Sequence, residues 1–317
     1  MMQFCKNPKI NFLGMKKITI GLSVVLVTGS LLLISVKNSD ILGIDFTGGS
    51  RLIVSYEEKT ETAQRVEVAA IEQYLKDNGY NARASYKTTE EGKEQLEIVL
   101  RGEVDKDTGA KIIEDMDKAY PDVKFDIKEQ TELGALIGAE FTKSAIIALV
   151  LAMIGMIIYM IIRFQLSYSI AANVALIHDV IVSLGIYLAF GGQLTLNVVA
   201  SLLTLIGYSV NDTIVTFDRQ RENLTLMRGA SYKDIVNTSI NQTLGRTILT
   251  STSVLLILIA QLIWGGDGIK DFISVMLIGC IVGCYSSIFI SPTITAYWHK
   301  RERNVSEADQ TVENINN

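Results

Sequence analysis

Long apolar blocks separated by polar segments dominate the chain. A helix needs about 20 predominantly apolar residues to cross the hydrocarbon core of a bilayer, and six blocks come close to or exceed that length. They lie at about Ile18–Val36, Ala145–Ile162, Tyr168–Phe190, Leu196–Phe217, Thr247–Trp264 and Phe272–Trp298. The pattern therefore predicts a polytopic α-helical membrane protein with six transmembrane helices.

A polar stretch of roughly 100 residues, enough for a domain of its own, separates the first block from the second. Alternating apolar and polar positions predict four strands, and a period near 3.6 predicts two helices. In chain order these elements are Arg51–Tyr56, the helix 62–77, Tyr80–Lys87, Gln95–Arg101, the helix 106–120 and Val123–Glu129. The order β-α-β-β-α-β is typical of an α+β ferredoxin-like sandwich, in which two helices cover one face of an antiparallel sheet.

Composition supports a membrane protein rather than a soluble globule. The mean hydropathy is +0.30, and the 317 residues include only 3 prolines. The first block could be mistaken for a secretory signal, but its apolar run is long and Val36–Asp40 offers no small-residue cleavage site. We therefore expect this block to be a retained membrane anchor.

The distribution of Lys and Arg predicts the orientation of the chain. Basic residues gather on one side of the predicted helices, and the opposite short flanks hold only Lys143 and Lys270. The basic side comprises Lys6, Lys9, Lys16, Lys17, Arg163, Arg219, Arg221, Arg228, Lys233, Lys300, Arg301 and Arg303. Because positive loops stay in the cytoplasm, both termini are predicted to be cytoplasmic and the sheet domain to be outside.

These patterns divide the chain into four parts. Residues 1–36 form the cytoplasmic N-terminus and the first transmembrane helix, and residues 37–138 form the extracytoplasmic domain. Residues 139–298 form a five-helix transmembrane bundle, and residues 299–317 form a polar cytoplasmic tail.

The charge of the external domain excludes one class of partner. Residues 37–132 hold 14 basic and 22 acidic residues, a net charge of −8, whereas the whole chain has −5. A domain this acidic, without a basic patch, argues against nucleic acid. It also has no cysteine, and Cys280 and Cys284 lie together in the last apolar block. We therefore expect neither a disulfide framework nor a metal site.

The stretch Leu202–Arg221 places Asp212 inside an apolar block. An Asp at the centre of a transmembrane helix costs about 2.5–3.5 kcal/mol on insertion scales, and such a residue usually faces a bundle interior and marks an ion path. Arg246 is the predicted partner, because both residues lie 17 positions from Gly229 in the intervening turn. If the two helices fold back there, both charges lie about 25 Å from the turn. A purely structural ion pair is the alternative.

Other polar residues follow helical spacing around these two charges and predict a polar seam that could hold water. They are Thr204, Tyr208, Asn211, Asp212 and Thr216 on the fourth block, and Arg246, Thr250 and Ser253 on the fifth. The third block adds His178 and Asp179, with Ser183 one turn later, as candidates either for a proton relay or for holding a helix in place. Gly279-x-x-x-Gly283 predicts close helix packing, and Ser231 with Asp234 predicts a helix-capping box.

Four motifs carry a resemblance to a known family. They are Gly43-Ile44-Asp45-Phe46-Thr47-Gly48-Gly49, Gly207-Tyr208-Ser209-Val210-Asn211-Asp212-Thr213, Phe217-Asp218-Arg219-Gln220-Arg221-Glu222-Asn223, and Ser239-Ile240-Asn241-Gln242-Thr243 followed by Arg246-Thr247. Because the four motifs occur in this order and at these places, the chain resembles the SecD/SecF family of the RND transporter superfamily. Its length resembles a stand-alone SecF subunit rather than a fused SecDF chain, which would be about twice as long.

The resemblance implies a subunit of the Sec protein-export machinery in the cytoplasmic membrane. With SecD, beside the SecYEG channel, it would use the proton-motive force to promote preprotein translocation. Asp212 and Arg246 fall on the positions that the family uses for proton transport. His178, Asp179, Asn211, Tyr208, Thr204 and Thr250 are candidates for relay or support, and the glycines of the first motif are candidates for a hinge. No enzymatic activity and no cofactor are expected; the coupling ion is H⁺, with Na⁺ as an alternative.

Other classes of function compete with this interpretation. A non-conducting scaffold that stabilises the translocon would share the same sequence features. A small-molecule RND exporter would be far longer, with twelve helices of its own. An intramembrane aspartyl protease needs two buried Asp residues, but neither Asp179 nor Asp212 lies in a Gly-x-Gly-Asp setting.

Overall fold

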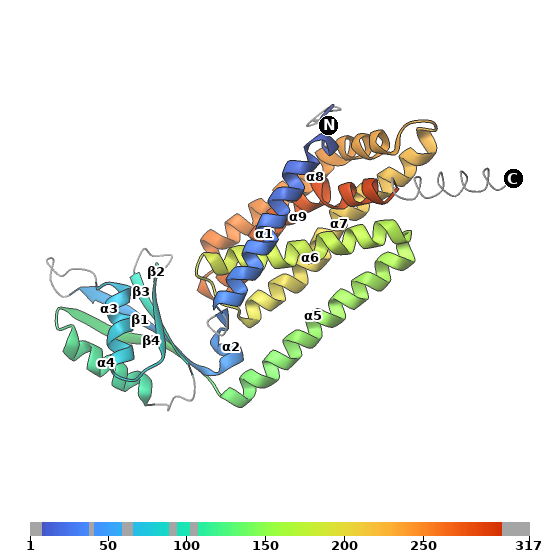
Figure 1. The fold of residues 1–317 in the computed structure, drawn as a ribbon. Coiled ribbons are helices and arrows are strands. Elements are labelled where there is room, and N and C mark those ends of the chain that lie inside the picture. The colour runs from blue at the N-terminus through green and yellow to red at the C-terminus, as the bar shows by residue number, and fades with distance from the viewer. Residues whose placement is uncertain (1–7, 38–40, 59–65, 89–93, 102–106, 300–317) are drawn as a thin grey trace.

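A computed structural model describes residues 8–37, 41–58, 66–88, 94–101 and 107–299. These residues form a helical bundle with a small α+β domain at one end (Figure 1). The described N-terminal residues lie at the opposite end of the bundle. The predicted fold class, a polytopic helical membrane protein with one sheet domain, is confirmed.

Six helices are long and apolar enough to cross a membrane. They are α1 (Lys16–Lys37), α5 (Ala135–Arg163), α6 (Leu166–Ala189), α7 (Leu196–Leu226), α8 (Tyr232–Trp264) and α9 (Lys270–Phe289), the last continued by helical residues 291–299. A short 3₁₀ turn, Leu13–Met15, precedes α1. Helices α5, α7 and α8 extend beyond the predicted apolar blocks, because their polar ends stay helical where hydropathy gives no signal.

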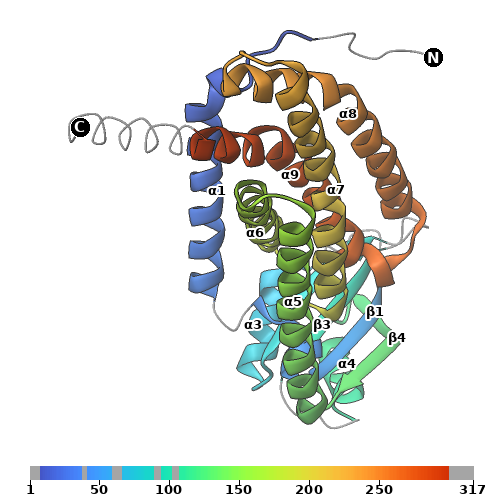
Figure 2. The ribbon, with the colours of Figure 1, turned by 90° about the vertical axis from the view of Figure 1, so that its right-hand side faces the viewer.

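Helices α6, α7 and α9 form the centre of the bundle, and at least half of the residues in the apolar window of each are buried. Small residues permit close approach at the crossings. A Cβ atom at Gly279 of α9 would lie 2.6 Å from side-chain carbons of Leu205 on α7, and one at Gly283 would lie 3.3 Å from Ser209. The predicted packing role of these two glycines is therefore confirmed. Helices α1, α5 and α8 lie outside and expose apolar side chains, as lipid contact requires (Figure 2).

The sheet domain has the predicted ferredoxin-like topology. Its strands are β1 (Gly49–Glu58), β2 (Ala82–Thr88), β3 (Glu94–Arg101) and β4 (Val123–Leu133). They pair antiparallel in the order β2-β3-β1-β4. Helices α3 (Val68–Asp77) and α4 (Thr108–Ala119) cover one face (Figure 1). The predicted first residues of these helices, 62–65 and 106, lie outside the described residues.

One hydrophobic core holds this domain together. Alternate β1 residues Leu52 and Val54 point toward the helices, where Ile71 and Leu75 of α3 and Met116 of α4 are fully or almost fully buried. Fully burying such side chains stabilises the fold by about 1.5–3 kcal/mol each. The strand period of 2 and the helix period of 3.6 thus bring their apolar faces together, as the pattern predicted.

The first motif connects the sheet domain to the bundle through a short helix, α2 (Ile44–Thr47). Leu42 forms a parallel bridge with Leu194, just before α7. The Gly43 N–H donates to the Leu194 carbonyl at 2.8 Å, and the Asp45 carboxylate accepts from the Leu196 N–H at 2.8 Å. Asp45 thus satisfies a backbone donor in the first turn of α7. Gly49 has φ 139°, and a Cβ atom there would collide with the Leu100 carbonyl of β3.

The α7–α9 crossing generates a prediction about stability. Replacing Gly279 by Val should lower the free energy of unfolding by about 1–3 kcal/mol, because the added methyl groups overpack the buried Leu205. Thermal unfolding of the detergent-solubilised protein measures the effect. Gly155→Val is the matched control, because nothing lies within 4 Å of a Cβ atom at that position of α5. Equal melting of the two variants would contradict this packing.

Candidate functional site

Asp212 is carried into the bundle interior by α7 and is only 6% exposed. The Ser251 hydroxyl of α8 donates to the Asp212 carboxylate at 3.4 Å. The Tyr208 hydroxyl donates to the Ser251 oxygen at 3.4 Å, and the Cys280 thiol of α9 donates to Tyr208 at 3.1 Å. A chain of hydrogen bonds across three helices therefore ends at this carboxylate. Such an arrangement can bind a proton and rearrange when the carboxyl group changes charge.

The predicted ion pair between Asp212 and Arg246 is not formed in the described part of the chain. Arg246 is exposed, whereas Asp212 is buried. The residue count from the turn sets the depth of each charge but not its rotation about the helix axis. In the turn of α8 that follows Arg246 the buried positions are Thr247 and Ser251, and packing of this face against α7 turns the neighbouring Arg246 outward.

The predicted polar seam is only partly present. Tyr208 and Asp212 of α7 reach the interface with α8, where both contact Ser251, which is not in the predicted stripe. Thr250 of the predicted stripe also interacts with the Asp212 carboxylate. The remaining members are exposed or satisfied by their own helix: Thr204 donates to Ala200, Thr216 to Asp212, Thr250 to Arg246 and Ser253 to Thr250, all at backbone carbonyls, and Asn211 is exposed. The face of α8 that meets α7 therefore includes Thr247 and Ser251, next to the predicted stripe, and leaves Arg246 outside.

Asp179 of α6 forms a second buried cluster and is 0% exposed. One carboxylate oxygen lies 3.0 Å from Nδ1 of His178. The other accepts hydrogen bonds from Ser209 of α7 at 2.5 Å and from Ser286 of α9 at 2.7 Å. The cluster joins the three central helices at one point. His178 Nε2 has no hydrogen-bond partner among the described residues, and the same holds for the hydroxyl of Ser183.

The two clusters share one turn of α7. Tyr208 and Asp212 face α8, whereas Ser209 faces Asp179. A change in the charge of either carboxylate therefore acts on the same helix turn. Sequence reasoning missed Ser209, Ser251 and Ser286, because serines are common packing residues of membrane helices and the spacing does not say which serine meets a carboxylate.

The later motifs hold the α7–α8 hairpin at the end away from the sheet domain. The Asn223 side-chain amide donates to Ser239 and to Gln242, each at 2.8 Å, and Arg219 donates to Gln242 at 2.6 Å. The N-cap half of the predicted capping box is confirmed, because the Ser231 hydroxyl accepts from the Asp234 N–H; the Asp234 carboxylate accepts from the Ser231 hydroxyl. These contacts fix where α8 begins relative to α7.

Comparison with known proteins gives consistent matches. The sequence model of the family described as "Protein export membrane protein SecD/SecF, C-terminal" matches residues 112–301. Protein translocase subunit SecF of Calditerrivibrio nitroreducens is 37% identical over 302 residues, covering 92% of this chain and 94% of that protein. The SecF subunit of Petrotoga mobilis is 33% identical over 320 residues, covering 95% and 100%.

A solved structure also matches. The crystal structure of SecDF, a translocon-associated membrane protein from Thermus thermophilus, superposes with a TM-score of 0.79 at 29% identity. The match covers 95% of this chain but 40% of the SecDF chain. The present chain thus resembles one part of a longer protein.

The Asp179 cluster generates a second prediction. Asp179→Ala should lower the free energy of unfolding by about 1–3 kcal/mol, because the buried Ser209 hydroxyl loses its hydrogen-bond acceptor. Asp179→Asn should cost less, since an amide oxygen still accepts from both serines. Thermal unfolding in detergent compares the two with Asn211→Ala, an exposed control on α7. If Asp179→Ala melts like the control, the cluster does not hold the central helices.

Proposed function

Because this chain belongs to the SecD/SecF family of protein-export membrane proteins, we propose that it works with SecD and uses the proton-motive force to promote preprotein translocation. The chain is a multi-pass cell-membrane protein of the Sec export system. The observation that carries the finer proposal is the buried Asp212 at the end of a hydrogen-bond chain across α7, α8 and α9.

Protonation of Asp212 is the proposed driving step. A proton arriving from outside neutralises the carboxylate and removes its need for the Ser251 donor, so α7 and α8 can repack. Release of the proton to the cytoplasm restores the charge. One charge crossing the membrane supplies about 2.3 kcal/mol per 100 mV, which is enough to shift a two-state bundle whose states differ by a few kcal/mol. Na⁺ remains the alternative coupling ion, and the proposed activity is transport without enzymatic chemistry or a cofactor.

The α2 connection is the proposed mechanical link to the sheet domain. Asp45 and the Leu42–Leu194 bridge attach the segment before β1 to the start of α7. Because α7 is a single helix from Leu196 to Leu226, a shift of the turn around Asp212 moves this attachment as well. The sheet domain would then act as the arm that contacts the emerging preprotein beside SecYEG.

The exposed polar residues of the membrane helices favour a second membrane subunit. Thr204 and Asn211 of α7, and Arg246 and Ser253 of α8, lie within the membrane-spanning segments and are exposed in this chain alone. Polar groups facing lipid are costly, so they usually face protein or water. SecD is the proposed subunit that covers them. At that interface Arg246 would contribute to the proton path, although it forms no ion pair with Asp212 in this structure.

Two other functions fit part of these observations. A role as a non-conducting scaffold would explain the packing around Asp179 but would not explain an ionisable side chain at Asp212. A small-molecule RND exporter subunit would also use a membrane carboxylate, but the similarity to SecF proteins over nearly the whole chain favours protein export.

The proposed orientation places the sheet domain outside and both termini in the cytoplasm. Asn78→Cys should react with a membrane-impermeant thiol reagent applied to intact cells, whereas Ala230→Cys should react only after permeabilisation. Both positions are exposed, and they lie in α3's C-terminal turn and in the α7–α8 turn. Labelling of the unmodified chain is subtracted as background. Reaction of Ala230→Cys in intact cells would exclude this orientation.

The proton proposal predicts the behaviour of Asp212→Asn. The amide retains the size and the acceptor oxygen but cannot ionise, so the protein should insert normally and lose the whole uncoupler-sensitive part of export. The assay is export of a preprotein into membrane vesicles with and without an uncoupler. Asp218→Asn is the matched control, because Asp218 is a more exposed carboxylate of the same helix that pairs with Arg163. An Asp212→Asn variant that keeps its uncoupler-sensitive export shows that Asp212 is not the proton carrier.

A further inference from the structure

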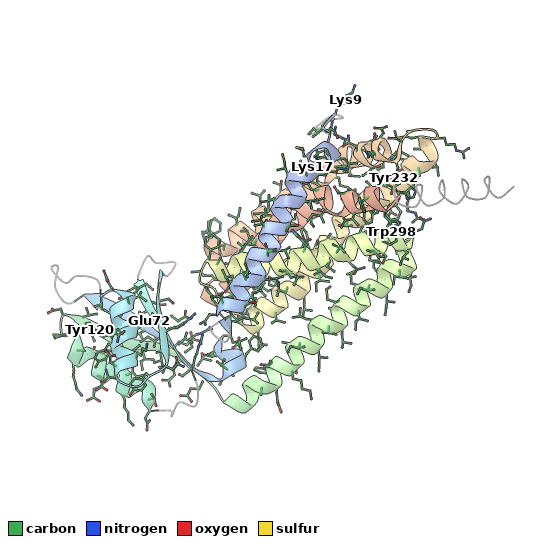
Figure 3. The ribbon with its side chains drawn as sticks, viewed as in Figure 1. Lys9, Lys17, Glu72, Tyr120, Tyr232 and Trp298 are labelled. Carbon is green, nitrogen blue, oxygen red and sulfur yellow. The ribbon has the colours of Figure 1, made fainter. Side chains whose placement is uncertain are left out.

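A groove of about 1480 Å³ lies at the end of the bundle away from the sheet domain. It is bounded by the N-terminal residues 8–21, the first turns of α8, and helical residues 293–297. Figure 3 labels Lys9 and Lys17 at this end of the molecule. No part of the proposed proton path or of the sheet domain lines the groove, so the transport mechanism above leaves it without a role.

Four lysines make the groove electropositive. Lys9, Lys16, Lys17 and Lys233 all line it and are all exposed. Among the described residues none of them forms an ion pair. The acidic lining residue, Asp234, has its carboxylate engaged by the Ser231 hydroxyl at 2.6 Å. The lining of the groove therefore carries an excess of positive charge.

Part of the lining of the groove is apolar and belongs to membrane helices. Lys16 and Lys17 occupy the first turn of α1, and Ile20 follows one turn deeper on the same helix. Ile294 and Tyr297 line the opposite wall. Basic groups at the helix ends with apolar side chains below them match a molecule that has an anionic head and a hydrocarbon chain.

Hydrogen bonds hold the walls of the groove in place. Asn237 of α8 accepts from the Phe12 N–H at 2.8 Å and donates to the Ile10 carbonyl at 3.0 Å. Asn241 accepts from the Ile10 N–H at 3.0 Å and donates to the same carbonyl at 2.9 Å. Phe12 is buried against Phe289, with ring centroids 5.7 Å apart. The N-terminal wall is thus attached to α8 and α9 without a ligand.

We propose that this groove is a binding site for one anionic phospholipid of the adjacent membrane leaflet. The lipid phosphate lies among the four lysines, and an acyl chain runs along Ile20 and Ile294. An acidic peptide or a soluble phosphate compound would meet the same charges but would leave the apolar lining uncovered. The lipid would bridge the start of α1 and the start of α8, the helix that carries Ser251 and Arg246.

The chain provides its own fluorescent reporter for this site. It has two tryptophans; Trp298 follows the lining residue Tyr297, whereas Trp264 ends α8 at the other end of that helix. Full-length protein with Trp264→Phe is reconstituted in phosphatidylcholine vesicles that contain increasing fractions of brominated phosphatidylglycerol or brominated phosphatidylcholine. We expect the brominated phosphatidylglycerol to quench Trp298 at a mole fraction at least fivefold lower.

A pair of lysine substitutions tests whether the groove causes this preference. Each basic residue near an anionic lipid contributes about fivefold in binding, so Lys9→Gln with Lys233→Gln should weaken the preference by about 25-fold or abolish it. The matched control is Lys76→Gln with Lys111→Gln, which removes the same charge from exposed positions of the sheet domain. The control should keep the preference of the parent protein.

Several results would overturn the proposal. Equal quenching by the two brominated lipids, or an unchanged preference in the Lys9 and Lys233 variant, means that the groove does not select an anionic lipid. Relief of quenching by millimolar glycerol phosphate means that a soluble phosphate compound is the ligand. A preference that emerges only after removal of residues 300–317 means that this C-terminal segment occupies the groove instead.

Discussion

Burial of two carboxylates in an apolar bundle is the constraint on which the membrane part depends. Asp179 and Asp212 have little access to water, so each needs donors from neighbouring helices. Ser209 and Ser286 supply them to Asp179, and Ser251 supplies one to Asp212. Because Ser209 and Asp212 lie on the same turn, α7 is held from both sides. The glycines of α9 then allow the close approach that these short hydroxyl bonds require.

Helix α7 connects the two ends of the molecule. Its first turn is attached to the sheet domain through Asp45, and its last turns are attached to α8 through Arg219 and Asn223. A change at Asp212 can therefore act in both directions along one continuous helix and through the hydrogen bonds at its two ends. This connectivity explains why the motifs that resemble the SecD/SecF family are scattered along the sequence: two of the four lie on α7, and the other two contact it directly.

The outer surface of the bundle has apolar regions and regions with exposed polar side chains. Apolar side chains of α1, α5 and α8 suit lipid tails, whereas the exposed polar positions of α7 and α8 suit a second membrane subunit. Four lysines border a groove at one end. The similarity to the SecDF structure covers 95% of this chain but only 40% of the SecDF chain.

Local patterns by themselves determined the six membrane helices, the β-α-β-β-α-β order, the Ser231 N-cap and the burial of Asp212. Hydropathy, period and capping act within one or two turns of chain, so a single sequence contains them. Only the tertiary structure decided that Arg246 faces outward, that Ser251 meets Asp212 and that Asp45 satisfies the start of α7. These outcomes depend on the rotation of each helix about its axis and on contacts between distant segments, and the packing of small residues between helices sets both.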